Sequence, residues 1–432
     1  ALIGRELSEA LHAHREDDID WLHTETREAM GLELATALDR AFAETIAATN
    51  KLTRDTKAQL QQVMFRECSR VWRAKFDLGS PAHLPPMKIT LIKGATPKGV
   101  RRQYRWTREQ HVFLRKHLNR LVNTGIISPI ETEWVCPVVL PAKRDGTWRL
   151  CVDPQSLNAQ TVPMIWEIPR VREELQERLH GSIWFSKFDF VAFFWQIPLH
   201  KDSRHLFSFF AGSHGSFCFN RVAMGARNSS VYTQKMVSRM FEHVQYKGQP
   251  LLRNGLEVLC DDVLLHAATQ EEMLELIKIF LRTCLIHNLA IHPSKCELFR
   301  TSLIYCGLHV SAKGITVDPE RVKAICSIPP PTNVGDVWKF KATVGWIRRD
   351  IPLLSESEAV LNDVVVNALK GAKRRDMKAA QRVPLTKSNW GEKETQAWNT
   401  IQEGLRATIT SSHRDRNKVA CVFTDASVTG WG

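Results

Sequence analysis

Three aspartates stand in apolar or aromatic stretches of the chain. Asp261 and Asp262 interrupt the apolar stretch 258–265, and Asp189 interrupts the aromatic stretch 185–198. Burying an unpaired carboxylate costs several kcal/mol, because the charge loses its hydration. A cation or a set of hydrogen bonds should therefore stabilise these side chains.

Taken singly, each aspartate also has a structural explanation. An isolated pair such as Asp261 and Asp262 is typical of a solvated hairpin turn, and Asp189 alone could be a structural hydrogen-bond acceptor. Two carboxylate-bearing strands of one small sheet can, however, be neighbours, and hard oxygen ligands of this kind suit Mg²⁺. Two such ions, roughly 3.5 to 4 Å apart, could activate a hydroxyl and stabilise a departing pyrophosphate. The aspartates are therefore candidate metal ligands for phosphoryl transfer.

The elements around the three aspartates are predicted to form a small α+β unit. The stretches 183–199 and 257–266 predict strands, the second as a hairpin that turns at the aspartate pair. The stretch 229–244 predicts a helix between them, and a capping box at Thr269 opens a further helix that ends at Asn288. An antiparallel sheet with helices on one face follows from this order.

The part of the chain before these elements divides at a break rich in proline and glycine. Residues 1–78 are rich in Ala, Leu, Glu and Arg, which predicts several amphipathic helices. Proline and glycine prevent helix continuation at 79–86. A helix is predicted over 106–127, followed by short strands and a hairpin up to residue 152.

Composition restricts the class of protein. The 432 residues carry a formal net charge of +13, which suits a polyanionic partner such as nucleic acid. No apolar run reaches the roughly 18 residues that a membrane span needs, and residues 1–25 are too charged for a signal peptide. The ten cysteines are scattered without a CxxC pair, which indicates reduced thiols. These features predict a soluble intracellular protein without a membrane partner.

Several motifs occur in an order that resembles one family. Asp189, the pair 261–262 and the stretch 288–299 resemble successive motifs of the reverse transcriptases of gypsy-type (Metaviridae) LTR retrotransposons. The same resemblance includes the stretches 148–158, 307–315 and 318–325. It extends from about residue 87 to the C-terminus, so the chain is similar to the reverse-transcriptase region of a Pol polyprotein.

The resemblance implies the α+β fold of a right-hand polymerase, with an antiparallel sheet in the palm. The expected parts are a helical N-terminal extension or linker (1–80), the first part of the fingers (81–165), the palm (166–312) with a fingers insertion near 197–228, the thumb (313–375), and a connection with an incomplete RNase H-like region (376–432).

The resemblance also implies the roles of four catalytic residues. Asp189, Asp261 and Asp262 would bind two Mg²⁺ ions, with Mn²⁺ as a substitute. Lys295 would donate a proton to the departing pyrophosphate, for which it must lie at the leaving oxygen. An ordinary surface lysine is the alternative for Lys295.

A second set of residues would contact the incoming nucleotide. Lys143 and Arg149 would contact the triphosphate, and Phe194 would exclude a ribose 2′-hydroxyl as a steric gate. Core packing is the alternative for Phe194, and a solvated hairpin charge is the alternative for Lys143. The remaining residues of the nucleotide and template groove would be Gln196, Met224 and Gly225.

The end of the chain resembles the start of an RNase H domain. Residues 419–427 are similar to its first strand, and Asp425 would be its first metal-binding acid. RNase H cleavage needs several carboxylates around its metal ions, and the sequence stops before the others. RNase H activity is therefore not expected from this chain.

Some positions depart from the family pattern. Leu259 replaces the aromatic residue that is usual two positions before the aspartate pair, and Pro154 also stands where an aromatic residue is usual. Two classes of function are therefore open: an RNA-directed DNA polymerase, and a decayed retroelement-derived protein that binds nucleic acid without polymerase turnover. A polymerase that makes RNA is disfavoured by Phe194, since a smaller residue is expected at that gate.

For the polymerase, the resemblance implies a defined set of partners. They are an RNA template, a DNA primer or duplex, and dNTPs. The expected location is the cytoplasm, within a retroelement particle, with the nucleus as a second compartment.

Overall fold

The computed structural model describes most of the chain after residue 31. The described residues are 32–48, 52–74, 77–97, 105–143, 146–351, 354–372, 374–407, 410–415, 418–419, 426–427 and 430–431. They divide into two compact units, one formed by residues 1–169 with 182–301 and the other by residues 170–181 with 302–432. Each unit has its own hydrophobic core.

The first unit contains a four-stranded antiparallel sheet in the order β11–β4–β10–β9. Its strands are β4 (Trp184–Asp189), β9 (Leu256–Leu259), β10 (Asp262–Ala267) and β11 (Glu297–Arg300). Residues 263–267 are buried on both faces of the sheet, which explains why this stretch is nearly all apolar rather than alternating.

Two helices of the first unit pack on this sheet. They are α8 (Ser229–Glu242) and α9 (Gln270–Ile286). The Thr269 side chain accepts a hydrogen bond from the Glu272 N–H, and Asn288 has a φ of +53°, so the predicted start and end of α9 are confirmed. Phe280 of α9 packs against Phe188 of β4, with 4.6 Å between ring centroids.

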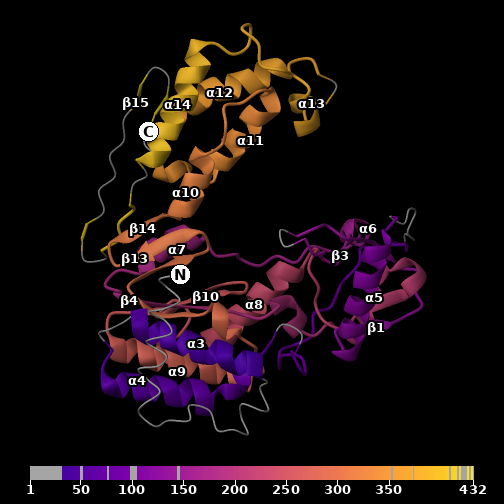
Figure 1. Cartoon of the computed structure of the whole chain (residues 1–432), viewed down its shortest axis with the longest axis vertical. Helices are drawn as coiled ribbons and strands as arrows, with labels where there is room; N and C mark the ends of the chain where they lie inside the picture. The colour runs from indigo at the N-terminus through magenta and orange to yellow at the C-terminus, as the bar shows by residue number, and fades with distance from the viewer. Residues whose placement is uncertain are drawn as a thin grey trace. The chain divides into compact units, whose positions relative to one another are not determined.

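The helices before residue 78 belong to the same core. They are α3 (Leu32–Ala48) and α4 (Arg54–Gln61), followed by the π-helical turn η1 (Gln62–Glu67) and the 3-10 turn η2 (Ser69–Val71). The Phe42 and Phe65 rings meet edge to face at 5.5 Å, and Figure 1 shows α4 beside α9. The helices predicted for 1–78 are confirmed over their described residues, and the predicted break at 79–86 is a loop within this unit.

A second sheet of the first unit has the order β1–β6–β5–β2–β3. Its strands are β1 (Ile127–Pro129), β2 (Cys136–Val139), β3 (Cys151–Val152), β5 (Ser208–Phe210) and β6 (Ser216–Phe219), antiparallel except for the pair β2–β5. Helix α5 (Arg108–Asn123) begins at a capping box of Thr107 and Gln110. The predicted helix and strands between residues 106 and 152 are confirmed, and β5 and β6 come from the predicted insertion near 197–228.

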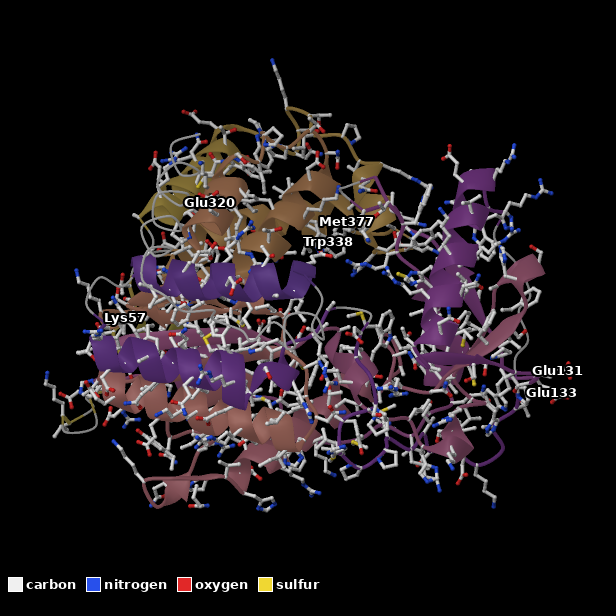
Figure 2. All side chains as sticks on the ribbon, turned by 60° about the horizontal axis from the view of Figure 1, so that its bottom comes forward. Lys57, Glu131, Glu133, Glu320, Trp338 and Met377 are labelled. Carbon is white, nitrogen blue, oxygen red and sulfur yellow. The ribbon has the colours of Figure 1, made fainter. Side chains whose placement is uncertain are left out.

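The second unit combines a three-stranded antiparallel sheet with helices. Its elements are α7 (Val171–Arg178), β12 (Ser302–Tyr305), β13 (Leu308–Ser311), β14 (Gly314–Val317), α10 (Pro319–Cys326), α11 (Val334–Gly345), α12 (Leu354–Ala368), α13 (Met377–Gln381) and α14 (Glu392–Arg406). Phe340 of α11 stacks on Trp398 of α14 at 3.8 Å. Helix α13 packs against α11, where Figure 2 labels Met377 and Trp338.

Helix α7 joins the second unit although the chain on both sides of it belongs to the first. The Arg172 guanidinium donates to both carboxylate oxygens of Asp350, which is completely buried. The Arg414 N–H donates to the Gln176 carbonyl at 2.8 Å. These contacts join residues far apart in the sequence, and no local pattern predicted them.

The strand predicted over 183–199 ends earlier than expected. β4 stops at Asp189, Ala192 has a left-handed φ of +42°, and the 3-10 turn η3 (Phe193–Gln196) follows. The aromatic run continues as a packed cluster in which the Phe190 and Phe193 rings stack at 5.1 Å. The run is therefore apolar because it is buried, and not because it is one long strand.

Short elements complete the described fold. They are α6 (Gln155–Asn158), η4 (Lys201–Ser203), η5 (Gly212–His214), β7 (Gln245–Tyr246), β8 (Gln249–Pro250), η6 (Pro293–Lys295), η7 (Arg348–Asp350), β15 (Ala426–Ser427) and β16 (Gly430–Trp431). The cysteines in the described ranges are free thiols, which agrees with the predicted reduced state. Over the same ranges, no helix combines the length and the apolar character needed to cross a bilayer.

Candidate active site

Asp189 and Asp262 are direct cross-strand partners. Asp189 is the last residue of β4, Asp262 is the first residue of β10, and the antiparallel register pairs the two. Asp261 lies in the turn before β10, and its carbonyl accepts a hydrogen bond from the Phe190 N–H at 3.2 Å. The fold therefore brings the three predicted aspartates together at one end of two neighbouring strands.

Gln234 of α8 holds the turn that carries the aspartate pair. Cys260 in this turn has a left-handed φ of +53°, and its N–H donates to Oε1 of Gln234 at 2.7 Å. Nε2 of Gln234 donates to the Val258 carbonyl at 3.1 Å. Gln234 is buried, so both of its polar groups need these partners. Gln234 was not predicted from the sequence, where its only sign is an amide on the apolar face of a helix.

Negative charge accumulates at this end of the sheet. Burial raises the pKa of the Asp261 carboxyl, and the charge of Asp189 raises it further. A backbone hydrogen bond and the charges of Lys295 and Lys187 lower the same pKa. Ionisation of Asp261 is therefore less favourable than in water, and a bound cation would relieve this penalty.

Two lysines contact the aspartates. Nζ of Lys295 in η6 lies 2.8 Å from Oδ1 of Asp189, and Nζ of Lys187 in β4 lies 3.9 Å from Oδ1 of Asp262. Lys295 was predicted to lie at this site. Lys187 was missed, although the alternation of side chains along a strand puts it on the same face as Asp189.

The donor set fits a hard divalent cation. Asp189, Asp261 and Asp262 offer carboxylate oxygens from two adjoining strands, and such oxygens are the usual ligands of Mg²⁺. Within the described part of the chain, no group of three or more acidic, histidine or cysteine side chains is arranged so that it could hold a metal ion as it stands. The carboxylates are close in the fold, and two of them contact lysines.

Cys260 adjoins the aspartates without being a nucleophile. Burial raises the pKa of its thiol to about 11, and the charges of Asp261 and Asp262 add to this effect. Because the thiolate is the reactive form, Cys260 is neutral and unreactive at neutral pH.

The turn η3 carries two of the residues predicted to contact a nucleotide. Phe194 is half-buried beside Phe193, with 6.2 Å between ring centroids. Gln196 is 2% exposed: Nε2 donates to the carbonyls of Val191 and Ala290, and Oε1 accepts from the Ala290 N–H. Gln196 therefore braces two backbone segments, and its place in the nucleotide and template groove stays a prediction.

Lys143 and Arg149 lie on the hairpin that follows β2. The Lys143 N–H donates to the Thr147 carbonyl at 2.7 Å, and the Arg149 N–H donates to the Pro141 carbonyl at 3.0 Å. Both side chains are exposed, so both charges are available to a ligand in solution. Their contact with a triphosphate stays a prediction.

The loop at Gly225 needs a glycine. Its φ is +96°, and a Cβ at this position would lie 3.3 Å from Cγ of Pro154. Nδ2 of Asn158 donates to the Gly225 carbonyl at 2.8 Å, and Oδ1 of Asn158 accepts from the Arg227 N–H at 2.8 Å. Met224 is 65% exposed. Pro154, which departs from the family pattern, thus packs against this glycine.

The last predicted site residue, Asp425, lies outside the described residues. Nearby, the short strands β15 and β16 pair with each other. The start of an RNase H domain stays a prediction.

The fold belongs to a known class of polymerase structure. A foamy viral protease–reverse transcriptase in complex with double-stranded DNA is similar to it with a TM-score of 0.73 and 18% identity, over 87% of this chain and 61% of that one. The foamy viral protein in complex with an RNA/DNA hybrid gives a TM-score of 0.71 and 18% identity, over 87% and 47% of the two chains. These likenesses confirm the predicted α+β right-hand polymerase fold.

The sequence is similar to reverse transcriptases over its central part. Residues 141–310 match the family described as reverse transcriptase (RNA-dependent DNA polymerase). The transposon Tf2-3 polyprotein of Schizosaccharomyces pombe is 27% identical over 314 residues, which is 72% of this chain and 21% of that protein. The Tf2-7 polyprotein of the same organism is 25% identical over 312 residues. The chain thus spans about a fifth of the length of the curated relatives it matches, and the predicted resemblance to retroelement reverse transcriptases is confirmed over this part.

Proposed function

We propose that this chain is the polymerase part of a retroelement Pol polyprotein and acts as an RNA-directed DNA polymerase. The observation that carries the proposal is the cross-strand pairing of Asp189 with Asp262, with Asp261 in the adjoining turn, in a region similar to reverse transcriptases. Nucleotidyl transfer depends mainly on positioning and on charge stabilisation, which such a carboxylate cluster can serve.

The carboxylates of Asp189, Asp261 and Asp262 would hold the divalent cations, for which we propose two Mg²⁺ ions with Mn²⁺ as a substitute. When bound, the ions supply the positive charge that favours the attacking primer 3′-hydroxyl and the departing pyrophosphate. Lys295, with its Nζ 2.8 Å from Asp189, would carry the proton that the pyrophosphate takes up.

Five further residues would bind the nucleotide. Lys143 and Arg149 are exposed on one hairpin, where their charges would pair with the triphosphate. Phe194 would block a ribose 2′-hydroxyl. The backbone at Gly225 would approach the nucleotide closely, with the exposed Met224 beside it.

The proposed partners are an RNA template, a DNA primer or duplex, and dNTPs. The foamy viral structures hold double-stranded DNA and an RNA/DNA hybrid, and the formal net charge of +13 suits such polyanions. For a retroelement protein, the proposed site of action is a cytoplasmic particle.

Primer extension on an RNA template tests the proposal. The chain should extend a DNA primer with dNTPs and Mg²⁺ or Mn²⁺, whereas an Asp261→Asn/Asp262→Asn variant should not, because an amide has no charge to hold a cation. A Glu131→Gln/Glu133→Gln variant is the matched control, since it neutralises two exposed acids in the loop between β1 and β2 (Figure 2), outside the sheet that carries the aspartates, and should remain active.

The outcome also separates the polymerase from its alternative. Equal product from the wild type and the aspartate variant would contradict the proposed site. No product from either, with retained binding to an RNA/DNA hybrid, would favour a decayed protein that binds nucleic acid without turnover. Leu259, the cross-strand partner of Asp262 in β9, is the nearest departure from the family pattern.

A further inference from the structure

Lys187 lies within the sheet end that carries the aspartates. It precedes Asp189 by two residues in β4, so both side chains emerge on the same face of the strand. Its cross-strand partners are Leu264 in β10 and Glu297 in β11. Asp262 precedes Leu264 by two residues in β10. Lys187 therefore has an acidic residue on each of the two neighbouring strands, Asp262 on β10 and Glu297 on β11.

Lys187 and Lys295 reach different aspartates from different elements. Lys187 Nζ is 3.9 Å from Asp262 Oδ1, and Lys295 Nζ is 2.8 Å from Asp189 Oδ1. The Lys187 side chain is 21% exposed, against 60% for Lys295. Lys187 is therefore the less exposed of the two lysine side chains at this site.

A lysine at this place has opposite effects on two states of the protein. Without a bound ion, the carboxylates of Asp189, Asp261 and Asp262 repel one another, and a nearby ammonium group offsets part of that repulsion. The same ammonium group repels a divalent cation that approaches the same oxygens. Removing the lysine charge should therefore destabilise the ion-free protein and strengthen ion binding.

We propose that Lys187 is a resident counterion, which stabilises Asp262 in the ion-free protein and is displaced from that carboxylate when a divalent cation binds. The inference rests on the proposed function only in taking the three aspartates as the cation site. Lys187 is then a positioning residue that sets the cation concentration at which the site fills.

Thermal unfolding of the full chain against increasing Mn²⁺, with electron paramagnetic resonance of Mn²⁺ to measure bound ion, tests the inference. Lys187→Met keeps an unbranched apolar stem and removes the charge. Without Mn²⁺ this variant should unfold at a lower temperature than the wild type. It should bind Mn²⁺ about two- to fivefold more tightly, the size expected from one partly exposed ion pair.

Two variants control for charge and for general loss of stability. Lys187→Arg keeps the positive charge and should retain the Mn²⁺ affinity of the wild type. Lys247→Met removes a lysine that pairs with Glu272 from the turn between β7 and β8, so it loses the same charge elsewhere in the first unit. It should leave the Mn²⁺ affinity unchanged. If Lys187→Met does not fold, Lys187→Gln serves the same comparison.

The aspartate variant separates the two proposals. Asp261→Asn/Asp262→Asn should lose the Mn²⁺ response. Equal Mn²⁺ affinity in the wild type and in Lys187→Met, with this response lost in the aspartate variant, would overturn the counterion role and leave the cation site intact. A Mn²⁺ response that survives in the aspartate variant would overturn both proposals. Tighter binding by Lys187→Met in a chain that extends no primer would support the counterion and contradict the polymerase.

Discussion

Phe194 is held by its neighbours in a short turn. Ala192, two positions before it, has a left-handed φ, and the buried Phe193 ring lies 6.2 Å from the Phe194 ring between centroids. We expect Phe194→Val to raise ribonucleotide incorporation relative to dNTP incorporation by about tenfold, a size typical of one small group in a shaped pocket. Primer extension with paired rNTP and dNTP substrates measures this ratio. Unchanged sugar selectivity would count against Phe194 as the gate.

Single residues differ in how far the sequence predicts them. The three aspartates could be predicted because charges within apolar runs are unusual and because their order resembles a family. Gln234 could not, since its partner is a backbone turn that only the fold brings near. Strand alternation places Lys187 on the face of Asp189, but only the fold brings its partner Asp262 near. Gln196 stands at a position of the family motif, but its side-chain amide is hydrogen-bonded to the backbone of Val191 and Ala290, which the motif did not indicate.

Helix α5 and the turn η5 meet at two histidines. Nδ1 of His111 lies 3.1 Å from Nε2 of His214, so one ring must supply the proton and the other the lone pair. Burial lowers the pKa of His214, and His111 and Arg115 lower it further by charge. Protonation of both rings would break this contact between the two elements.

The stability of the protein should therefore fall in mild acid. The folded-state pKa of His214 is below its unfolded value of about 6.5, so the unfolded chain binds the proton more readily. The contribution to stability is complete above that value and is lost as the pH falls toward the folded-state pKa. Thermal unfolding between about pH 7.5 and pH 5 measures it. His214→Gln should lose less stability than the wild type over this interval. If the unfolding temperatures of the two proteins fell in parallel with pH, His214 would not be the source of the loss.

Elements whose ends are set by residues close in the sequence could be predicted with the correct bounds. Helix α9 was predicted because Thr269 caps its start and Asn288 ends it, and both act within a few residues. The strand over 183–199 was predicted too long because its apolar pattern continues past Asp189. The left-handed conformation of Ala192 ends the strand, and alanine carries no sequence signal for it.

The whole chain passes between its two units three times, at residues 169–170, 181–182 and 301–302. Helix α7 between the first two crossings is fixed to the second unit by the buried pair of Arg172 with Asp350. The two residues are separated by 178 positions in the sequence, which is why their pairing could not be predicted from local patterns.

Breaking this pair should destabilise the second unit. Arg172→Met leaves the Asp350 carboxylate buried without its partner, and we expect the free energy of unfolding to fall by about 3 kcal/mol. Arg172→Met/Asp350→Leu should regain much of this loss, because no unpaired charge remains. Urea unfolding measures both variants. Glu177→Gln, which removes an exposed pair with Arg414, is the control and should cost less than about 1 kcal/mol. If Arg172→Met and Glu177→Gln lowered the free energy of unfolding equally, the buried pair would have no special role in stability.

The path of the chain also limits how the protein can be divided. Truncation after residue 301 would leave α7 without β14, which it contacts, and Arg172 without Asp350, while β4 would start from that unanchored helix. A smaller fragment that keeps the candidate active site must therefore either keep residues 302–432 or replace residues 170–181 by a short linker. For the same reason, force applied to the second unit reaches the strand that ends at Asp189 through the backbone itself.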